Sequence, residues 1–154
     1  MSDTHLNAPL QVRNDMPADA PTIAVIDDDE SVRRALRRFI DLLGYNVETF
    51  ATAEEFLESF LVPDSQAEAH AAEAFRCVIL DQHLPGMSGL ELQKRLKAEG
   101  RDVAIVFITA YPNIRAQNQA LLVGAIAFLD EPFEEQVFLD AVQKGLFQSQ
   151  TTDG

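Results

Sequence analysis

The chain has 154 residues, 47% of them hydrophobic, and its 25 acidic and 12 basic side chains give a net charge of −13. This composition predicts one domain with its own core, and the negative charge argues against direct binding to nucleic acid. No apolar run approaches the ~20 residues of a membrane span, and no secretion signal is recognisable. The single cysteine, Cys77, excludes an internal disulfide framework. We therefore expect a cytoplasmic protein that binds other proteins.

The two ends of the chain lack a pattern that predicts regular structure. Residues 1–20 are polar and have no sustained hydrophobic period, so we interpret them as a flexible tail, with a docking arm as the alternative. Residues 149–154 are interpreted as a second tail. The predicted domain therefore comprises residues 21–148.

Within the predicted domain, short apolar runs alternate with stretches of helical spacing. Five runs are typical of strands: Ile23–Asp27, Asn46–Phe50, Arg76–Asp81, Val103–Thr109 and Ile126–Leu129. Apolar residues recur with a helical period after each run. Five strand–helix units joined by short loops predict an α/β fold, a doubly wound five-stranded parallel sheet with helices on both faces.

The predicted helices begin and end at residues typical of helix termini. Thr52 with Glu55, and Ser88 with Glu91, have the spacing of capping boxes and open the second and third helices. Gly44 ends the first helix. Similar signals place the other boundaries: Pro112 in the first turn of the fourth helix, Gly124 near its end, and Glu134 to Phe147 for the fifth.

Residues 62–75 interrupt the alternation of strands and helices between the second helix and the third strand. The segment is rich in strong helix formers but has little apolar surface. We interpret it as an extended stretch or an extra helical turn on the surface. A tolerated insertion is the main interpretation, and a partner site is the alternative.

Acidic or hydroxyl side chains stand where four of the predicted strands end. Asp27 and Asp28 follow the first strand, Asp81 ends the third, Thr109 ends the fourth, and Asp130–Glu131 follow the fifth. In open parallel sheets ligands bind outside the carboxyl ends of the strands. Carboxylates crowded there repel one another unless a cation lies among them, and oxygen ligands suit Mg²⁺.

This arrangement predicts phosphoryl chemistry at Asp81. A carboxylate can act as a nucleophile and form an acyl phosphate, given a phosphoryl donor, a metal ion and hydrogen-bond donors for the phosphoryl oxygens. Asp27 and Asp28 can hold Mg²⁺ together with Asp81, and the Thr109 hydroxyl can donate to a phosphoryl oxygen. A single acidic residue at a strand end is more often a helix cap or a solvated charge. The placement of two acidic groups and a threonine at three strand ends instead favours a phosphoryl-binding site.

The motifs around these residues resemble the receiver domains of bacterial two-component response regulators, the CheY-like members of the flavodoxin-like fold. The resemblance covers residues 21–148, and the first helix and fifth strand are most similar to FixJ-type receivers. The matching segments are Val25-Ile26-Asp27-Asp28, Leu80-Asp81-Gln82-His83-Leu84-Pro85-Gly86-Met87-Ser88-Gly89, Phe107-Ile108-Thr109-Ala110 and Gly124-Ala125-Ile126-Ala127-Phe128-Leu129-Asp130-Glu131-Pro132-Phe133.

The resemblance implies a role for each residue at the acidic edge. Asp81 is expected to be phosphorylated by a histidine kinase or a phosphotransfer protein. Asp27, Asp28 and Asp81 are expected to bind Mg²⁺ together with the backbone carbonyl of His83. Family members are not enzymes in the usual sense, because they assist only their own phosphorylation and dephosphorylation.

The resemblance also implies a switch. Thr109 and Phe128 are expected to form the switch pair, in which the hydroxyl moves toward the phosphoryl group and the aromatic ring turns inward. The face made by the fourth helix, fifth strand and fifth helix is expected to present the state to a downstream protein; a homodimer is left open. The side chains of His83 and Tyr111 are expected to hinder water that attacks the acyl phosphate.

Glu131 is the main departure from the family pattern, which has a Lys at this position. Replacing a cation with an anion beside the acidic cluster should weaken phosphorylation, the acyl phosphate or signalling, since unit charges 4 Å apart interact by about 4 kcal/mol at a dielectric near 20. Arg115 is a weaker candidate for a substitute cation. The bond between Glu131 and Pro132 is expected to be cis, as the family implies.

Three functions are therefore considered. The first is a phosphoacceptor receiver that signals through a protein partner. The second is an atypical receiver, suggested by Glu131, whose partner binding needs no phosphorylation. The third is a Mg²⁺-dependent phosphatase of the haloacid dehalogenase type, which needs a second Asp two residues after the nucleophile. Position 83 is His, so only Asp27 and Asp29 have that spacing.

Overall fold

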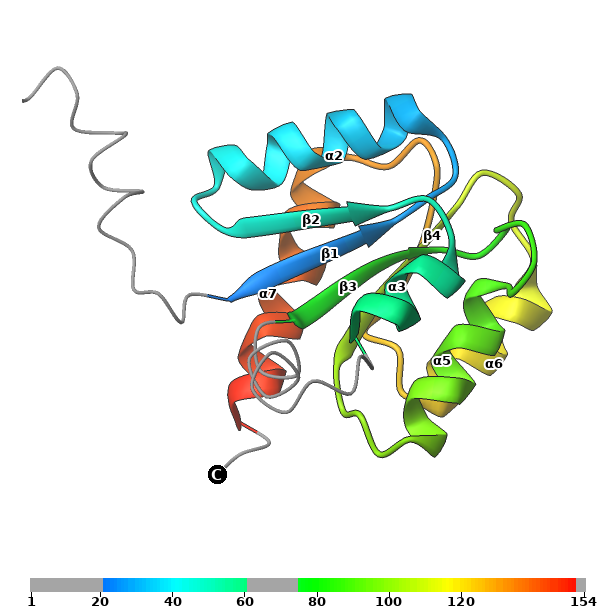
Figure 1. Ribbon diagram of the computed structural model, residues 1–154. Coiled ribbons are helices and arrows are strands. Elements are labelled where there is room, and N and C mark those ends of the chain that lie inside the picture. Colours follow the sequence, from blue (N-terminus) through cyan, green and yellow to red (C-terminus); the bar gives the residue numbers. More distant parts are fainter. Residues whose placement is uncertain (1–20, 61–74, 152–154) are drawn as a thin grey trace, which may run out of the picture.

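The structure, a computed structural model, describes residues 21–60 and 75–151. In this part of the chain five strands form one parallel sheet in the order β2-β1-β3-β4-β5 (Figure 1). The strands are β1 (Thr22–Ile26), β2 (Asn46–Phe50), β3 (Phe75–Asp81), β4 (Ala104–Thr109) and β5 (Ala127–Asp130). The predicted α/β class, with a doubly wound five-stranded parallel sheet, is confirmed.

The described helices cover both faces of the sheet, as Figure 1 shows. One face packs against α2 (Glu30–Leu42) and α7 (Glu135–Thr151). The other packs against α3 (Ala53–Phe60), α5 (Gly89–Ala98) and α6 (Ile114–Val123). The molecule therefore has three layers and a separate apolar core on each side of the sheet.

The central strands are apolar along their whole length because both of their faces are covered. In β1, Ile23 and Val25 pack in the core under α2 and α7, and Ala24 and Ile26 pack in the opposite core. All four side chains are fully buried. Successive side chains of a strand point to opposite faces, so a continuous apolar run is the sequence pattern that fits a central position.

The helix starts differ in part from the prediction. Ser88 accepts from the amide of Glu91 while the Glu91 carboxylate accepts from the amide of Ser88, which confirms that capping box. Thr52 accepts from the amide of Glu55, but the Glu55 carboxylate binds the amide of Ala51, one residue before the expected partner. At both helices, the side chains still satisfy amides that the first turn leaves free.

The position of Pro112 was predicted wrongly. Helix α6 begins at Ile114, and Asn113 is its N-cap, accepting from the amide of Ala116 at 3.0 Å. Pro112 therefore precedes the helix. The Asn side chain can cap the first turn and Pro cannot, so the cap sets the boundary. Gly124, with φ 119°, ends α6 as expected.

The last helix is longer than predicted. It continues to Thr151 instead of ending near Phe147, and so includes the start of the predicted tail 149–154. Neither Gly nor Pro occurs at positions 148–151, so the sequence contains no typical helix stop over this stretch. The predictions for residues 1–20 and for most of 62–75 lie outside the described residues. A search of the described residues finds no helix long and apolar enough to cross a membrane.

The strand register aligns the carboxyl ends of the central strands. Ile26 at the end of β1 lies beside Leu80 of β3, and Asp81 lies beside Ile108 of β4. The residues that follow β1 therefore meet Asp81 where the strand order reverses, between β1 and β3. This is the edge at which open parallel sheets bind ligands.

Gly89 allows helix α5 to start close to this edge. A Cβ at position 89 would lie 2.7 Å from the carbonyl oxygen of Asp81 and 3.0 Å from the Cα of Gln82. Both are backbone atoms, so they cannot turn aside as a flexible side chain can. The absence of a side chain at Gly89 therefore permits the close packing of α5 against the end of β3.

Candidate functional site

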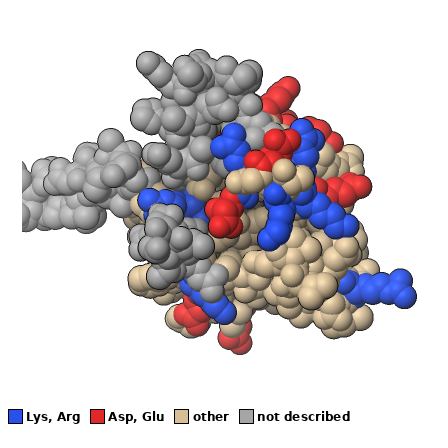
Figure 2. Space-filling view, turned by 90° about the horizontal axis from the view of Figure 1, so that it is seen from below, with Lys and Arg blue, Asp and Glu red and all other residues tan. Residues whose placement is uncertain are grey.

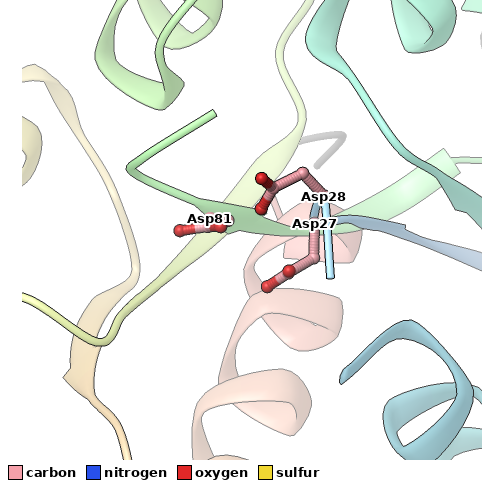
Figure 3. A group of neighbouring side chains, drawn as sticks. All are labelled: Asp27, Asp28 and Asp81. Carbon is pink, nitrogen blue, oxygen red and sulfur yellow. The ribbon is translucent and has the colours of Figure 1, made fainter. Parts of the chain in front are cut away.

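The carboxylates of Asp27, Asp28 and Asp81 converge at the ends of β1 and β3 (Figure 3). Each offers an oxygen atom, and these three oxygens lie within 4.8 Å of one another. Asp27 is 3% exposed and Asp81 is 9% exposed, whereas Asp28 is exposed. The predicted convergence of these three residues is thus present, with one carboxylate open to solvent.

Backbone amides hold the two buried carboxylates. The amide of Asp29 donates to Oδ1 of Asp27 at 2.8 Å, and the amide of His83 donates to Oδ1 of Asp81 at 3.0 Å. Each bond joins a residue to the amide two positions on, the short-range pattern that Asp side chains favour in turns. The turns after β1 and β3 therefore fix the carboxylates through local hydrogen bonds.

The buried carboxylates ionise less readily than ordinary aspartates. Burial, together with the charges of Asp27, Asp28 and Glu131, raises the pKa of Asp81 to about 7, against the opposing effect of the His83 amide. Burial also raises the pKa of Asp27 to about 6, opposed by the Asp29 amide. Burial and mutual repulsion both disfavour the charged forms, and a bound cation would relieve both.

The donor set fits a magnesium ion. Mg²⁺ binds oxygen ligands at about 2.0–2.1 Å in an octahedron, so its ligand oxygens lie about 3 to 4 Å apart. Three carboxylate oxygens within 4.8 Å of one another need only a small contraction to meet that geometry. Carboxylate oxygens are also the chemical type that Mg²⁺ prefers. Asp27, Asp28 and Asp81 are therefore able to hold Mg²⁺.

Thr109 and Phe128, the predicted switch pair, are both buried at the same end of the sheet. The Thr109 hydroxyl is fully buried, accepts from the amide of Tyr111 at 3.0 Å and donates to the Tyr111 carbonyl at 3.2 Å. The Phe128 ring is 9% exposed and stacks on Phe107 with a centroid separation of 5.4 Å. The ring therefore points inward, while the hydroxyl binds its own loop.

Glu131 lies close enough to the cluster for its charge to matter. It contributes to the raised pKa values of Asp27 and Asp81, and its own pKa is raised by burial and by the charge of Asp29. The bond to Pro132 is cis, as expected.

Asp29 is occupied as the N-cap of α2, where its Oδ1 accepts from the amide of Ser31 at 2.8 Å. Its carboxylate is thus held away from a phosphatase role.

Two aromatic side chains stand next to the site. The rings of His83 and Tyr111 pack edge to face with a centroid separation of 5.3 Å. Both residues are exposed, and Tyr111 is 69% exposed. They follow Asp81 and Thr109 by two positions each, so the ring pair spans the loops after β3 and β4.

The sequence analysis missed one basic residue at the site. Nη1 of Arg33, in α2, donates to the backbone carbonyl of Asp27 at 2.6 Å. By contrast, Arg115, the cation considered from the sequence, is exposed on α6. The helical spacing of α2 places Arg33 on the first turn, but only the close approach of that turn to the end of β1 reveals the contact.

Charged side chains are mixed over the described surface shown in Figure 2. Basic and acidic groups lie next to one another there, beside a broad area without charges. In the part of this face that the structure describes, the basic groups form no continuous stripe of the kind that tracks a phosphate backbone.

The structure is a three-layer α/β domain with an acidic cluster at the ends of β1 and β3, and comparison with known proteins identifies its family. The family model described as "Response regulator receiver domain" matches residues 23–143. The chain therefore belongs to the response regulator receiver domain family, as the motifs indicated. The structure of the response regulator StyR has a TM-score of 0.75 and 42% identity, covering 87% of this chain and 63% of StyR.

Similar full-length regulators are longer than this chain. Response regulator protein TodT of Pseudomonas putida is 34% identical over 127 residues, which cover 82% of this chain and 52% of TodT. Transcriptional regulatory protein FixJ of Bradyrhizobium diazoefficiens is 30% identical over 128 residues, covering 83% of this chain and 58% of FixJ. The chain thus spans about half the length of the curated relatives that it matches.

Proposed function

We propose that this receiver domain accepts a phosphoryl group on Asp81 in a two-component phosphorelay, with Mg²⁺ held by Asp27, Asp28, Asp81 and the backbone carbonyl of His83. The observation that carries the proposal is the convergence of three carboxylates at the end of β1 and β3. A buried carboxylate at a strand end, next to one that is open to solvent, suits a nucleophile beside a metal site.

The chemical step is a transfer of one phosphoryl group. The free oxygen of the Asp81 carboxylate attacks phosphorus and forms a P–O bond, and the bond from phosphorus to the donor breaks. The electron pair of that bond returns to the leaving group, an imidazole nitrogen in a phosphohistidine donor. Mg²⁺ neutralises the phosphoryl oxygens when bound. Oδ1 of Asp81 stays oriented by the His83 amide, and the Thr109 hydroxyl donates to a phosphoryl oxygen after leaving the Tyr111 carbonyl.

A groove beside the cluster is a suitable place for the donor protein. It has a volume of about 610 Å³ and lies between α2 and the loop after β5. Glu131 and Ala110, which line it, are neighbours of the acidic site. A donor must bring its phosphohistidine to Asp81, so its surface must contact this region. Apart from Ser31, the other lining residues are apolar: Val32, Ala35, Leu36, Pro132 and Phe133.

The test is phosphotransfer in the presence of Mg²⁺. Wild type and Asp81→Asn are incubated with acetyl phosphate, or with a phosphorylated histidine kinase, and examined by intact mass spectrometry. We expect a mass gain of one phosphoryl group in the wild type and none in the variant. A wild type that stays unmodified with every donor would overturn the proposal.

The atypical receiver remains a second candidate because Glu131 adds a negative charge where phosphoryl oxygens must be accommodated. Glu131→Lys should raise the phosphorylation rate by up to about tenfold, equivalent to about 1.4 kcal/mol. Glu135→Lys makes the same charge change at an exposed position of α7 and should have little effect. If wild type and Asp81→Asn bind the downstream partner equally, and neither is phosphorylated, the atypical function is favoured.

A further inference from the structure

The side chain of Arg33 forms a hydrogen bond to the turn that carries two of the proposed Mg²⁺ ligands. Nη1 of Arg33 donates to the backbone carbonyl of Asp27 at 2.6 Å. Arg33 is half-buried, so this bond is partly shielded from water. Hydrogen bonds from charged donors are shorter and about twice as strong as bonds between neutral groups. The contact joins α2 to the end of β1.

Arg33 completes a set of bonds around a very short connection. Only three residues separate β1 from α2, and Asp27 and Asp28 are two of them. The Asp29 amide orients the side chain of Asp27, and the Asp29 carboxylate caps α2 through the amide of Ser31. These two bonds fix one side of the turn. The Arg33 bond fixes the carbonyl on the main chain between Asp27 and Asp28.

The neighbouring arginine is differently placed. Arg34 forms an ion pair with Glu30 at 2.9 Å, and the side chains of both residues are more than two thirds exposed, at 70% and 73%. Exposed pairs of this kind contribute little to stability. Arg33 and Arg34 therefore carry the same charge on the same helical turn, but only the first contacts the segment that bears the carboxylates.

We propose that Arg33 is a positioning residue of the Mg²⁺ site, which presets the Asp27–Asp28 segment through its bond to the Asp27 carbonyl. This inference rests on the Mg²⁺ site of the proposed function. Groups that orient metal ligands without touching the metal change metal affinity when they are removed. Arg33 does not contact Asp81 and takes no part in the transfer itself.

The test measures Mg²⁺ affinity of the full chain by isothermal titration calorimetry. Arg33→Gln removes the charged donor, and we expect its Kd for Mg²⁺ to rise about tenfold. Arg33→Lys keeps a charge and a donor, and should recover part of the affinity.

Arg34→Gln is the matched control, because it removes the same charge one residue further along an exposed surface. We expect its Kd to stay within about twofold of wild type, since exposed charges are well screened. Equal Kd values for Arg33→Gln and Arg34→Gln would overturn the proposal. Should Arg33→Gln fail to fold, Arg33→Lys takes its place: a Kd for Mg²⁺ clearly weaker than that of Arg34→Gln supports the proposal, and a Kd equal to it overturns the proposal.

Failure of the proposed function gives a different result. A wild type that binds Mg²⁺ but takes no phosphoryl group overturns the phosphoacceptor function, while the affinities of the Arg33 variants still decide the inference. A wild type that shows no Mg²⁺ binding overturns both.

Discussion

The Asp81 carboxylate is almost fully buried, and it lies among other acidic groups. Both properties raise its pKa, to about 7. For the proposed phosphoryl transfer the Asp81 carboxylate must be ionised, so the negative charge of the cluster would oppose that reaction until a cation binds. This explains at the residue level why Mg²⁺ and phosphorylation should depend on each other.

The raised pKa of Asp81 predicts how the stability of the metal-free chain varies with pH. An unfolded Asp ionises near pH 3.9, whereas folded Asp81 ionises at about pH 7. The contribution of Asp81 to the free energy of unfolding is therefore most favourable below about pH 4, where the residue is protonated in both states. This contribution is lost as pH rises toward 7 and above. Asp81→Asn stays neutral throughout, so its stability advantage over wild type should grow from pH 4 to pH 8.

Urea denaturation without metal, followed by circular dichroism, measures this difference. A variant that lacks an exposed carboxylate, Asp140→Asn, serves as the control and should not develop a growing advantage. A difference between Asp81→Asn and wild type that is the same at all pH values would show that Asp81 ionises normally in the folded chain.

The ring pair of His83 and Tyr111 predicts the lifetime of the acyl phosphate. The packed rings span the loops after β3 and β4, and we expect them to hinder water that attacks the proposed acyl phosphate. His83→Ala or Tyr111→Ala should therefore hydrolyse severalfold faster than wild type, as measured by loss of the phosphorylated mass with time. Tyr111→Phe keeps the ring and should decay like wild type. Unchanged decay in both Ala variants would contradict this role.

At the scale of elements, the groove between α2 and the loop after β5 can be tested separately from the chemistry. Ala35 is exposed in this groove. Ala35→Arg should hinder docking of a protein donor and reduce phosphotransfer from it by at least about tenfold, the equivalent of losing about 1.4 kcal/mol of binding. Phosphorylation by acetyl phosphate, which needs no docking surface, should be unaffected.

The measurement compares initial rates with the two donors. Arg38→Ala, at an exposed position on the same helix but outside the groove, is the control for changes to the helix surface. Equal losses with both donors would mean that Ala35→Arg disturbs the acidic site itself, and no loss with the protein donor would place docking elsewhere.

At the scale of the whole molecule, Mg²⁺ should stabilise the fold, because three of its proposed ligands come from two strand ends that meet only in the folded sheet. A ligand that binds only the folded state stabilises it by about 2.7 kcal/mol at a hundredfold excess over Kd. We expect Tm to rise by several degrees in wild type and much less in Asp27→Asn. Equal shifts would show that Mg²⁺ binds elsewhere.

Much of the fold could be predicted from local patterns. The apolar runs of β1, β3 and β4 read as strands that are buried on both faces, and the described sheet has these three at its centre. Element boundaries were less reliable. Asn113 replaced Pro112 as the residue that sets the start of α6, and α7 continued past Phe147, because capping and packing contacts decide such boundaries.

The amino-acid sequence by itself determined the family, the parallel sheet and the identity of the acidic residues, because each follows from short-range apolar periodicity and motifs. Only the tertiary structure decided how those residues act on one another. The register of β1 on β3 sets the distance between carboxylates, burial sets the pKa of Asp81, and the approach of α2 brings Arg33 to the Asp27 carbonyl. These depend on groups distant in the chain, which no local pattern specifies.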